Sequence, residues 1–251
     1  MPPILAVTGL RAEARIASGY GVITVAGGGD PARLALLLQA ALTRGARAVI
    51  SFGIAGGLAP GVVPGTVLIG RGVHYAGERT ETASAWVVRL AAALPHALVT
   101  DIAGVDVPVV GAADKAALHG HTGAAAVDME SHVAARLASL HGVPFAALRV
   151  VADPAERTLP PAALVGMRPD GTTDIGAVLR SLARAPRQLP ALIRTGLDAK
   201  AAFAALKASR RDLATLFDGG GVGRDGGFDV VGDLDLDPAG LRRNAAEFRA
   251  G

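Results

Sequence analysis

The sequence predicts an α/β fold, in which a central and largely parallel sheet carries helices on both faces. Ala, Val, Leu and Gly dominate its 251 residues and aromatic residues make up only 4%, which favours an aliphatic core with close backbone packing at the glycines. Short apolar runs typical of buried strands alternate with stretches in which apolar residues recur at helical spacing. This alternation indicates parallel strands joined by helices on either side of the sheet.

The expected strands are five apolar runs, at 4–7, 22–25, 48–52, 67–69 and 145–151. The expected helices cover 34–42 and 129–140, and in the second of these Met129, Val133 and Leu137 form one apolar face. Ligands of such sheets bind beyond the carboxyl ends of the strands. Functional residues are therefore expected in the segments that directly follow the strands.

Charge divides the chain into three segments. Residues 1–174 hold 13 basic and 13 acidic side chains, 175–217 carry eight Lys or Arg against two Asp, and 218–251 carry four basic against seven acidic side chains. The first segment is expected to form the functional core, and the second a set of basic helices packed on or beside that core. The third is rich in Gly and Asp and is predicted to be a disordered tail.

Composition excludes several classes of function. The chain has no cysteine, which rules out disulfide scaffolds, thiolate catalysis and cysteine-ligated metals. No metal site is predicted from histidine, because His119 and His121 flank Gly120 in an expected loop without a further ligand at suitable spacing. The pI is near 9.8, but no aromatic stacking platform for nucleic acid is evident. No basic signal-peptide region precedes Ile4, so a cytoplasmic location is expected.

Two glycine-rich segments follow expected strands. In the first, Gly9 with Arg11 and Arg15 could hold an anion beside exposed backbone N–H groups, although most arginines in such places are surface charges. In the second, the glycines of 53–57 would let a ligand lie against the main chain, or would serve a tightly packed corner. A third glycine run, at 27–29, lacks dinucleotide-binding spacing, so no nucleotide cofactor is expected.

Two carboxylates stand at the ends of apolar runs. Glu130 would lie in the first turn of a helix, where it either pairs with the helix dipole or accepts hydrogen bonds from two ribose hydroxyl groups. Asp153 ends the last expected strand before Pro154, where it could cap a helix without any part in catalysis. The residues by themselves leave the alternatives open at both positions.

Together these segments resemble the nucleoside phosphorylase and nucleosidase superfamily, which includes methylthioadenosine/S-adenosylhomocysteine nucleosidases. G-I-A-G-G-L at 53–58 is similar to the family's G-S-A-G-G-L signature, 127–131 to its V-D-M-E-S signature and 149–153 to its R-x-x-S-D segment. The resemblance covers about residues 4–165, with the motifs in order. It implies a three-layer αβα phosphorylase-like fold, with a central mixed sheet and helices on both faces.

The resemblance also implies roles for individual residues. Met129 would pack under the ribose of a nucleoside and Glu130 would bind its hydroxyl groups, while Asp153 would protonate N7 of the leaving purine. The ribose and base site would be lined by Met129 and Glu130 together with Gly53, Ile54, Ala55 and Gly56. The reaction implied is cleavage of the N-glycosidic bond of an adenine nucleoside, with phosphate or water attacking C1′.

Departures from the family's patterns leave the attacking nucleophile open. G-L-R-A at 9–12 is similar to the phosphate loop G-D-P-L-R-A of the hexameric phosphorylases and keeps Arg11. However, Ser51 and Ile54 stand where those enzymes place a phosphate-binding arginine and serine. The water-activating glutamate of the nucleosidases has no clear match either, because Glu13 is one residue out of register.

A narrower resemblance, over about residues 1–217, is to the hopanoid-associated phosphorylases. It rests on T-G-L-x-A-E-A-R at 8–15, S-F-G-I-A-G-G-L at 51–58, A-D-P-A-E-R-x-L-P-P at 152–161 and the basic C-terminal helices. It implies a pentosyltransferase that needs no cofactor and uses phosphate to remove adenine from adenosylhopane in hopanoid biosynthesis, with Gly9, Arg11 and Arg15 as phosphate ligands. The alternatives are a hydrolytic nucleosidase acting on methylthioadenosine, S-adenosylhomocysteine or a related adenine nucleoside, and a non-catalytic nucleotide-binding module.

The resemblance extends to partners. An enzyme acting on a membrane lipid would benefit from a surface that contacts anionic headgroups, and the basic segment 191–217 is predicted to supply this peripheral membrane contact. The alternative is a basic helix that simply faces solvent. Because the family commonly assembles as dimers, trimers or hexamers, a homo-oligomer is also expected.

Overall fold

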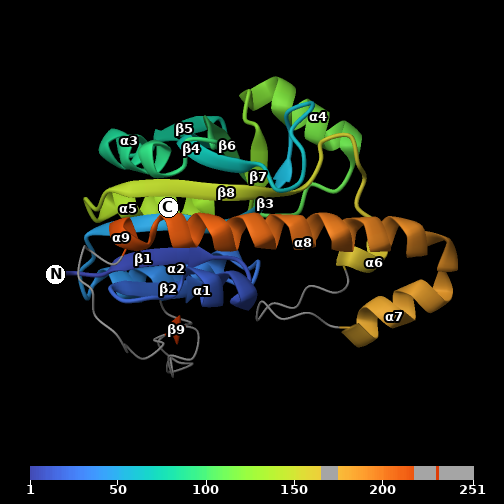
Figure 1. Cartoon of the computed structure of the whole chain (residues 1–251), viewed down its shortest axis with the longest axis horizontal. Coiled ribbons are helices and arrows are strands. Elements are labelled where there is room, and N and C mark those ends of the chain that lie inside the picture. Colours follow the sequence, from blue (N-terminus) through green and yellow to red (C-terminus); the bar gives the residue numbers. More distant parts are fainter. Residues whose placement is uncertain (165–174, 218–229, 232–251) are drawn as a thin grey trace.

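The computed structural model describes residues 1–164, 175–217 and 230–231, which form a sheet with helices on both faces (Figure 1). The strands in these ranges are β1 (Ile4–Thr8), β2 (Val22–Ala26), β3 (Ala48–Gly57), β4 (Val67–Tyr75), β5 (Glu78–Glu81), β6 (Leu98–Gly104), β7 (Ala126–Asp128), β8 (Phe145–Asp153) and β9 (Val230–Val231). They pair in the order β5-β4-β6-β7-β3-β1-β2-β9, and β8 pairs with both β3 and β4. The predicted three-layer αβα class is confirmed.

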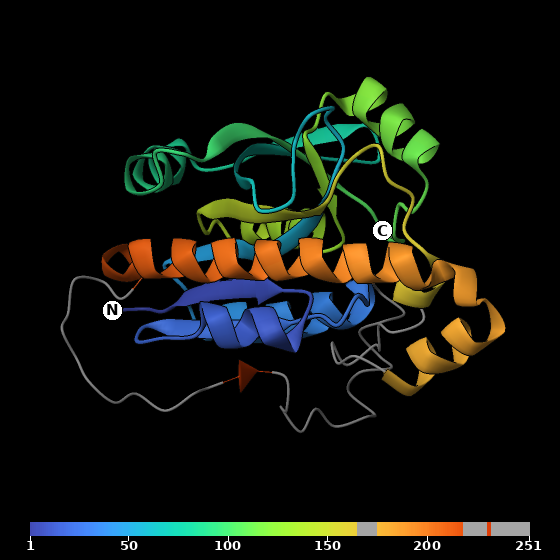
Figure 2. The ribbon, with the colours of Figure 1, turned by 45° about the vertical axis from the view of Figure 1, so that its right-hand side comes forward.

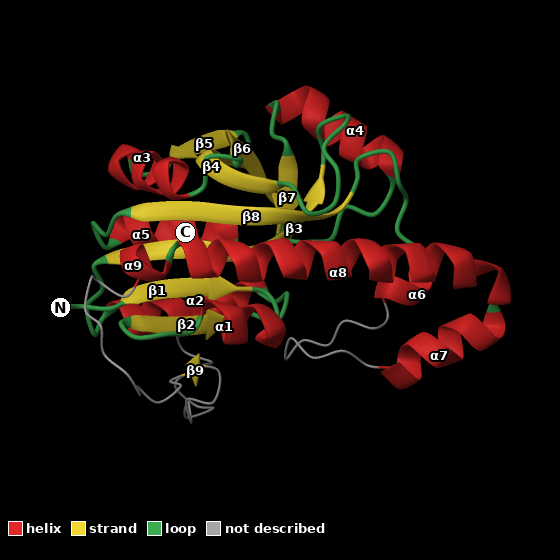
Figure 3. Ribbon diagram, viewed as in Figure 1, coloured by secondary structure: helices red, strands yellow, loops and turns green. Residues whose placement is uncertain are grey.

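The helices in the same ranges are α1 (Arg11–Ala17), α2 (Pro31–Leu42), α3 (Ser84–Ala93), α4 (Ala112–Thr122), α5 (Ser131–Leu140), α6 (Pro161–Leu164), α7 (Ile175–Arg184), a 3-10 turn (Pro186–Gln188), α8 (Leu189–Asp212) and α9 (Ala214–Phe217). Figure 3 distinguishes these helices from the strands that lie between them. In the described ranges, no helix is both long and apolar enough to cross a membrane.

Four central strands lie parallel to one another. β1 pairs with β2 and with β3, and β3 pairs in turn with β8. Their side chains are nearly all buried, as expected for strands covered on both faces. All four were predicted, but β3 continues beyond Phe52 to Gly57 because its glycines keep pairing with β8. The glycine-rich segment 53–57 is therefore strand, and not the loop or corner that the sequence suggested.

The remaining strands make the sheet mixed. β4 is antiparallel to β5 and β8 but parallel to β6, and β7 is antiparallel to β3. The sheet is still largely parallel, as expected, because the pairings of β1 with β2 and β3, of β2 with β9, of β3 with β8 and of β6 with β4 and β7 are all parallel. The three antiparallel pairings make it the mixed sheet that the family resemblance implied. Sequence periodicity predicted only the start of β4 and missed β5, β6 and β7. β5 is polar and largely exposed, β6 is interrupted by Thr100 and Asp101, and β7 is very short.

Both predicted helices of the first segment are present. α2 begins at Pro31 because the side chain of Asp30 accepts hydrogen bonds from two N–H groups of the first turn, both at 3.0 Å. α5 begins at Ser131, so Met129 and Glu130 precede this helix instead of lying in its first turn.

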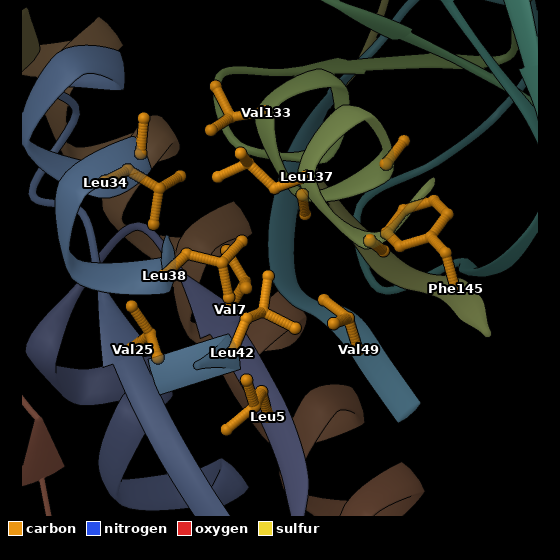
Figure 4. Close-up of a cluster of buried hydrophobic side chains, with 14 of the residues drawn as sticks. Leu5, Val7, Val25, Leu34, Leu38, Leu42, Val49, Val133, Leu137 and Phe145 are labelled. Atoms are coloured by element: carbon orange, nitrogen blue, oxygen red, sulfur yellow. The ribbon is translucent and has the colours of Figure 1, made fainter. Parts of the chain in front are cut away.

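One apolar layer fills the space between the sheet and the pair α2 and α5. Leu38 of α2 and Leu137 of α5 are almost completely buried and point toward one another above Val7 and Val49 of the central strands (Figure 4). This layer covers one face of the sheet and holds α5 against it. It thereby positions Glu130, the residue directly before α5.

The opposite face of the sheet is covered by α1, α3 and the inner part of α8, from Ala202 onward, which runs along the strands (Figure 2). The residues of α8 before Ala202 form its outer part. Ala202 and Leu206 of α8 and Phe217 of α9 are fully buried, and the ring of Phe217 lies 6.1 Å from that of Phe52 in an edge-to-face arrangement. One side of residues 202–217 thus packs on the core, while Lys207 and Arg211 on the other side are exposed. The predicted membrane contact at 191–217 stays a prediction, and within that segment only the outer part of α8, before Ala202, exposes large apolar side chains.

Matched substitutions in α8 test this division of the helix. Leu206→Ala is expected to lower the free energy of unfolding by about 2–5 kcal/mol, because it leaves a cavity between α8 and the sheet. Leu197→Ala, at a side chain that is 63% exposed, is expected to change it by less than about 0.5 kcal/mol. Urea unfolding followed by circular dichroism measures both values. Equal effects of the two substitutions would show that the inner part of α8 does not stabilise the core.

Two predictions concern segments at the end of the chain. Within 175–217, the inner part of α8 and α9 pack on the sheet, whereas α7 and the outer part of α8 extend away from it (Figure 1). The predicted disordered tail at 218–251 lies outside the described residues, apart from β9, which pairs in parallel with β2.

Candidate functional site

A cavity of about 200 Å³ lies where β1, β3, β7 and β8 end. Four acidic residues line it. The side chain of Asp128 pairs with Arg149 and accepts a hydrogen bond from the backbone before α5, and the other three, those of Glu13, Glu130 and Asp153, are called the cavity carboxylates. Much of the remaining wall is apolar, contributed by Leu10, Ile54, Val105, Pro108, Val109, Val127 and Leu159. A concave apolar pocket with a few convergent polar groups at the ends of strands is typical of a small-molecule site.

Glu13 enters the cavity from the first turn of α1. One of its carboxylate oxygens accepts hydrogen bonds from the N–H groups of Gly9 and Leu10, at 2.8 and 2.7 Å. The other accepts a hydrogen bond from the N–H of Ile54 on β3, at 2.8 Å. The side chain is only 1% exposed, so these three N–H groups hold a carboxylate in a site from which bulk water is excluded.

Each carboxylate of the cavity approaches a glycine. A Cβ added to Gly53 would lie 2.6 Å from the Glu13 carboxylate, and one added to Gly9 would lie 2.6 Å from that of Glu130. At Gly56 an added Cβ would come within 3.5 Å of Oδ1 of Asp153 and 3.3 Å of Val127. The glycines that the sequence analysis assigned to ligand contact therefore also make room for the protein's own acidic groups.

The side chain of Arg149 on β8 lies behind the cavity, where it pairs with the carboxyl groups of Asp128 and Glu130. Its guanidinium group is completely buried, with Nε 2.8 Å from Oδ2 of Asp128 and Nη2 3.2 Å from Oε2 of Glu130. It also donates hydrogen bonds to the hydroxyl of Ser51 and to the carbonyl oxygen of Ile54. One fixed positive charge is therefore surrounded by the carboxyl groups of Glu13, Asp128 and Glu130.

Asp128 fixes the backbone that carries Glu130. Its Oδ1 accepts hydrogen bonds from the N–H groups of Glu130 and Ser131, at 3.0 and 2.7 Å, and the Ser131 hydroxyl donates to Oδ2. This arrangement caps the start of α5. Since Asp128 also pairs with Arg149, the carboxylate of Glu130 is positioned through both its backbone and its charge.

Burial raises the proton affinity of all three cavity carboxylates. It raises the pKa of Glu130 to about 8, against the opposing attraction of Arg149. It also raises the pKa of Glu13, again opposed by Arg149, and that of Asp153, where Lys115 opposes the rise. Carboxyl groups with raised pKa values can act as acids or bases near neutral pH, and they cluster at functional sites.

The raised pKa of Glu130 makes stability depend on pH. The folded state holds this proton up to about pH 8, whereas the unfolded chain releases it near the ordinary value of 4.5. The free energy of unfolding therefore falls as pH rises through this window. Thermal unfolding between pH 5 and 8 is expected to show a shallower loss of stability for Glu130→Gln than for the wild type. Parallel curves for the two proteins would contradict this prediction.

Asp153 is the last residue of β8 and does not cap a helix, because the next helix, α6, begins at Pro161. Its side chain lies in the cavity lining and forms an ion pair with the ammonium group of Lys115 on α4. The capping interpretation of Asp153 is thus not supported by the fold, which leaves its carboxyl group available to a ligand.

The structure brings most of the predicted site residues together. The cavity is lined by Gly9, Ile54, Ala55, Gly56, Met129, Glu130 and Asp153, all of which were named from the sequence. Gly53 lies behind them, against Glu13 and Arg149. These residues come from β3, β8 and the segments that follow β1 and β7, so the chain positions them through the ends of its central strands.

The two arginines predicted to bind phosphate are not in the cavity lining. Successive residues of a helix are rotated by about 100°, so Arg11 and Arg15, each two positions from Glu13, point away from the side that Glu13 occupies. Arg15 is exposed. In the described part of the chain, no lysine or arginine lines the cavity, and the N–H groups of Gly9 and Leu10 that an anion would use are bonded to Glu13.

Sequence reasoning missed three residues of this site. Glu13 was set aside because it is one residue out of register, yet its helix places it in the cavity. The helical rotation between Glu13 and its two neighbouring arginines was a signal that could have found it. Arg149 lay within a recognised motif without an assigned role, and Lys115 carried no local signal because its contact with Asp153 spans 38 positions of the chain.

The histidines that flank Gly120 lie in the last turn of α4, and not in the expected loop. His119 Nδ1 is 2.9 Å from the carbonyl oxygen of Ala124, so this side chain closes the end of the helix. Within the described ranges, no group of three or more His, Asp or Glu side chains is arranged to hold a metal ion.

Comparisons with known proteins connect this geometry to a family. A family model of the phosphorylase superfamily matches residues 14–185. No curated protein sequence matches the chain. The matched range contains the ends of β3 and β8 and the segment before α5, and therefore most of the cavity lining.

Solved structures share the fold at low sequence identity. A 5′-methylthioadenosine/S-adenosylhomocysteine nucleosidase from Helicobacter pylori, bound to butyl-thio-DADMe-Immucillin-A, is 17% identical with a TM-score of 0.63, over 87% of this chain and 99% of its own. A nucleosidase of the same name from Colwellia psychrerythraea, in complex with adenine, is 18% identical with a TM-score of 0.55, over 61% and 84%. Futalosine hydrolase from Helicobacter pylori is 16% identical with a TM-score of 0.60, over 87% and 98%. At these identities the likeness is one of fold.

Proposed function

Because the chain belongs to the phosphorylase superfamily, we propose that it cleaves the N-glycosidic bond of an adenine nucleoside, with water as the attacking nucleophile. The observation that carries the choice of water is Glu13, whose buried carboxylate occupies the N–H groups of Gly9, Leu10 and Ile54. A phosphate ion would have to displace this carboxylate and would meet its negative charge. Water needs no such displacement.

The three carboxylates have distinct parts in the proposed reaction. Asp153 protonates N7 of the adenine, so that the base leaves as a neutral molecule. Glu130 accepts hydrogen bonds from the ribose hydroxyl groups, above the packing surface of Met129. Glu13 orients the water that attacks C1′ and accepts its proton, a task that suits a carboxyl group whose pKa is raised by burial.

The charge of the cavity supports the same reaction. As the bond to the base breaks, the ribose acquires positive oxocarbenium character, and fixed negative charge close to it lowers the energy of this state. In the proposed reaction Glu13 carries this charge until it accepts the proton of the water, whereas Asp153 enters the reaction protonated. Two of the structures with this fold carry nucleosidase names and one is a hydrolase, which also favours hydrolysis.

The experiment that tests the proposal is an assay of adenine release from adenosine, methylthioadenosine and S-adenosylhomocysteine, each with and without phosphate. Mass spectrometry then identifies the sugar product. Release in phosphate-free buffer with a free ribose product is expected. A strict requirement for phosphate with a ribose 1-phosphate product would overturn the choice of water, and the absence of any adenine release would overturn the proposal as a whole.

The second candidate is phosphorolysis of adenosylhopane, a substrate linked to a membrane lipid. The observation that favours a lipid-linked substrate is the outer part of α8, where Leu189, Ile193 and Leu197 are exposed in a basic segment that includes Arg194 and Lys200. Exposed apolar side chains among basic residues suit an anionic membrane surface. Because the apolar side of residues 202–217 packs on the core, only this outer part offers exposed apolar side chains for the predicted contact. Adding adenosylhopane in vesicles to the same assay tests this candidate.

A further inference from the structure

We infer that Lys115 is a positioning residue for Asp153, the acid of the proposed reaction. Its ammonium group directs the proton of Asp153 to the carboxyl oxygen that faces the base, and it stabilises the carboxylate left after proton transfer. This inference rests on the proposed function, because it concerns how the acid of that reaction works. Lys115 lies on α4, pairs with Asp153 at the end of β8, and does not line the cavity itself.

The ammonium group of Lys115 has its hydrogen-bond donors fully used. Nζ contacts Oδ2 of Asp153 and donates hydrogen bonds to the carbonyl oxygens of Pro154 and Arg157, at 3.1 and 3.0 Å. An ammonium group has three N–H donors and no acceptor, so this set of partners matches its charged form. The interaction leaves Oδ1 of Asp153 as the oxygen that can carry a proton.

The position of Lys115 is unusual for a lysine. Its side chain is completely buried, and it is the buried residue of a helix that otherwise lies at the surface. Burying an ammonium group costs free energy unless it is paired and hydrogen bonded. An apolar residue of similar length would fill the same space, so packing by itself gives no reason for a positive charge beside Asp153.

The charge has a use in the proposed reaction. When the C1′–N9 bond breaks, its electron pair passes to the purine, and the proton on Oδ1 of Asp153 moves to N7. The water oxygen bonds to C1′ and its proton passes to Glu13, so atoms and charges balance. Asp153 becomes a carboxylate in a buried place, and the adjacent ammonium of Lys115, which keeps its own protons, offsets the cost of that charge.

Lys115 also has a structural contact that a test must separate from this role. The segment it anchors, 154–157, continues into an ion pair between Arg157 and Asp198 of α8. A substitution at 115 could therefore move the segment. Two variants address this: Lys115→Gln keeps hydrogen-bond donors but removes the charge, and Lys115→Met removes both.

The test measures the pKa of Asp153 directly, by carbon-13 NMR of its carboxyl group, and separately the pH profile of kcat. In both variants the Asp153 pKa is expected to rise by about 1–3 units, because an adjacent opposite charge is lost. The alkaline limb of kcat should move by the same amount, and the plateau below it should fall about tenfold or more while KM changes little. Lys207→Gln, at an exposed lysine of α8, is the matched control and should leave both readouts unchanged.

The outcomes separate this inference from the proposed function. An unchanged Asp153 titration in a folded Lys115→Gln protein would overturn the role of Lys115 while leaving nucleoside cleavage intact. A wild-type protein that releases no adenine would overturn the function, yet the NMR titration would still show whether Lys115 controls the acid. If neither variant folds, Lys115 is a purely structural residue and the inference is wrong.

Discussion

Asp153→Asn is expected to lower the rate of adenine release by about 10²- to 10⁴-fold, the usual contribution of a positioned general acid. The amide keeps the size and hydrogen-bonding capacity of the side chain but cannot supply the proton to N7. Because the base would then have to leave as an anion, kcat should carry the loss. Calorimetry with adenine is expected to show binding close to that of the wild type.

A change of leaving group makes this prediction specific. A 4-nitrophenyl riboside has a leaving group that is stable as an anion, so it needs no acid, and Asp153→Asn should cleave it at nearly the wild-type rate. Glu156→Gln is the matched control, since Glu156 is an exposed carboxylate in the turn that follows Asp153, and it should be fully active. An equal loss on both substrates would mean that Asp153 acts in binding or folding instead of proton transfer.

Glu13→Gln is expected to reduce hydrolysis by about 10²- to 10⁴-fold on every substrate, including the 4-nitrophenyl riboside. The amide cannot accept the proton of the attacking water. Its NH₂ group would also face a backbone N–H, because both carboxylate oxygens of Glu13 are used as acceptors. If the 4-nitrophenyl riboside does not restore the rate, the defect lies in activation of the attacking water. If it does restore the rate, the defect lies in protonation of the leaving base.

Arg15→Gln is the matched control for Glu13 on the same helix. Arg15 is exposed and two positions away, so hydrolysis should continue unchanged in this variant, with phosphate or without it. If Arg15→Gln instead abolished a phosphate-dependent reaction, while Glu13→Gln retained that reaction, phosphate would be the nucleophile and the arginines its ligands. The pair of variants therefore decides between the two reactions of this family.

The parts of the fold that were predictable from the sequence are those set by local apolar pattern. β1, β2, β3 and β8 were found because strands covered on both faces consist of unbroken apolar runs. β5, β6 and β7 were missed, since a polar edge strand, a strand with two polar residues in its middle and a three-residue strand have no such pattern. The extension of β3 to Gly57 was missed because glycine has no strand preference of its own and pairs there only in the presence of β8.

The site was predictable to a similar degree. Glu130 and Asp153 could be named because each follows an apolar run within a recognisable motif. The burial of Glu13 and the placement of Lys115 depend on contacts between distant segments, which a single sequence does not display. The placement of Arg11 and Arg15 outside the cavity lining has another origin: the motif match treated them as side chains that share one direction, although a helix begins at Arg11 and turns them away from Glu13.

The placement of α8 also has a consequence for the synthesis of the protein. The second apolar layer joins Ile4 and Val22, made first, to Leu206 and Phe217, made late. A chain still attached to the ribosome before residue 217 has emerged leaves that side of its earliest strands uncovered, and exposed apolar surface of this kind promotes aggregation. The first layer needs nothing beyond residue 147. The two faces of the sheet therefore become complete at different times, and a nascent chain in this interval is the form of the protein most in need of a chaperone.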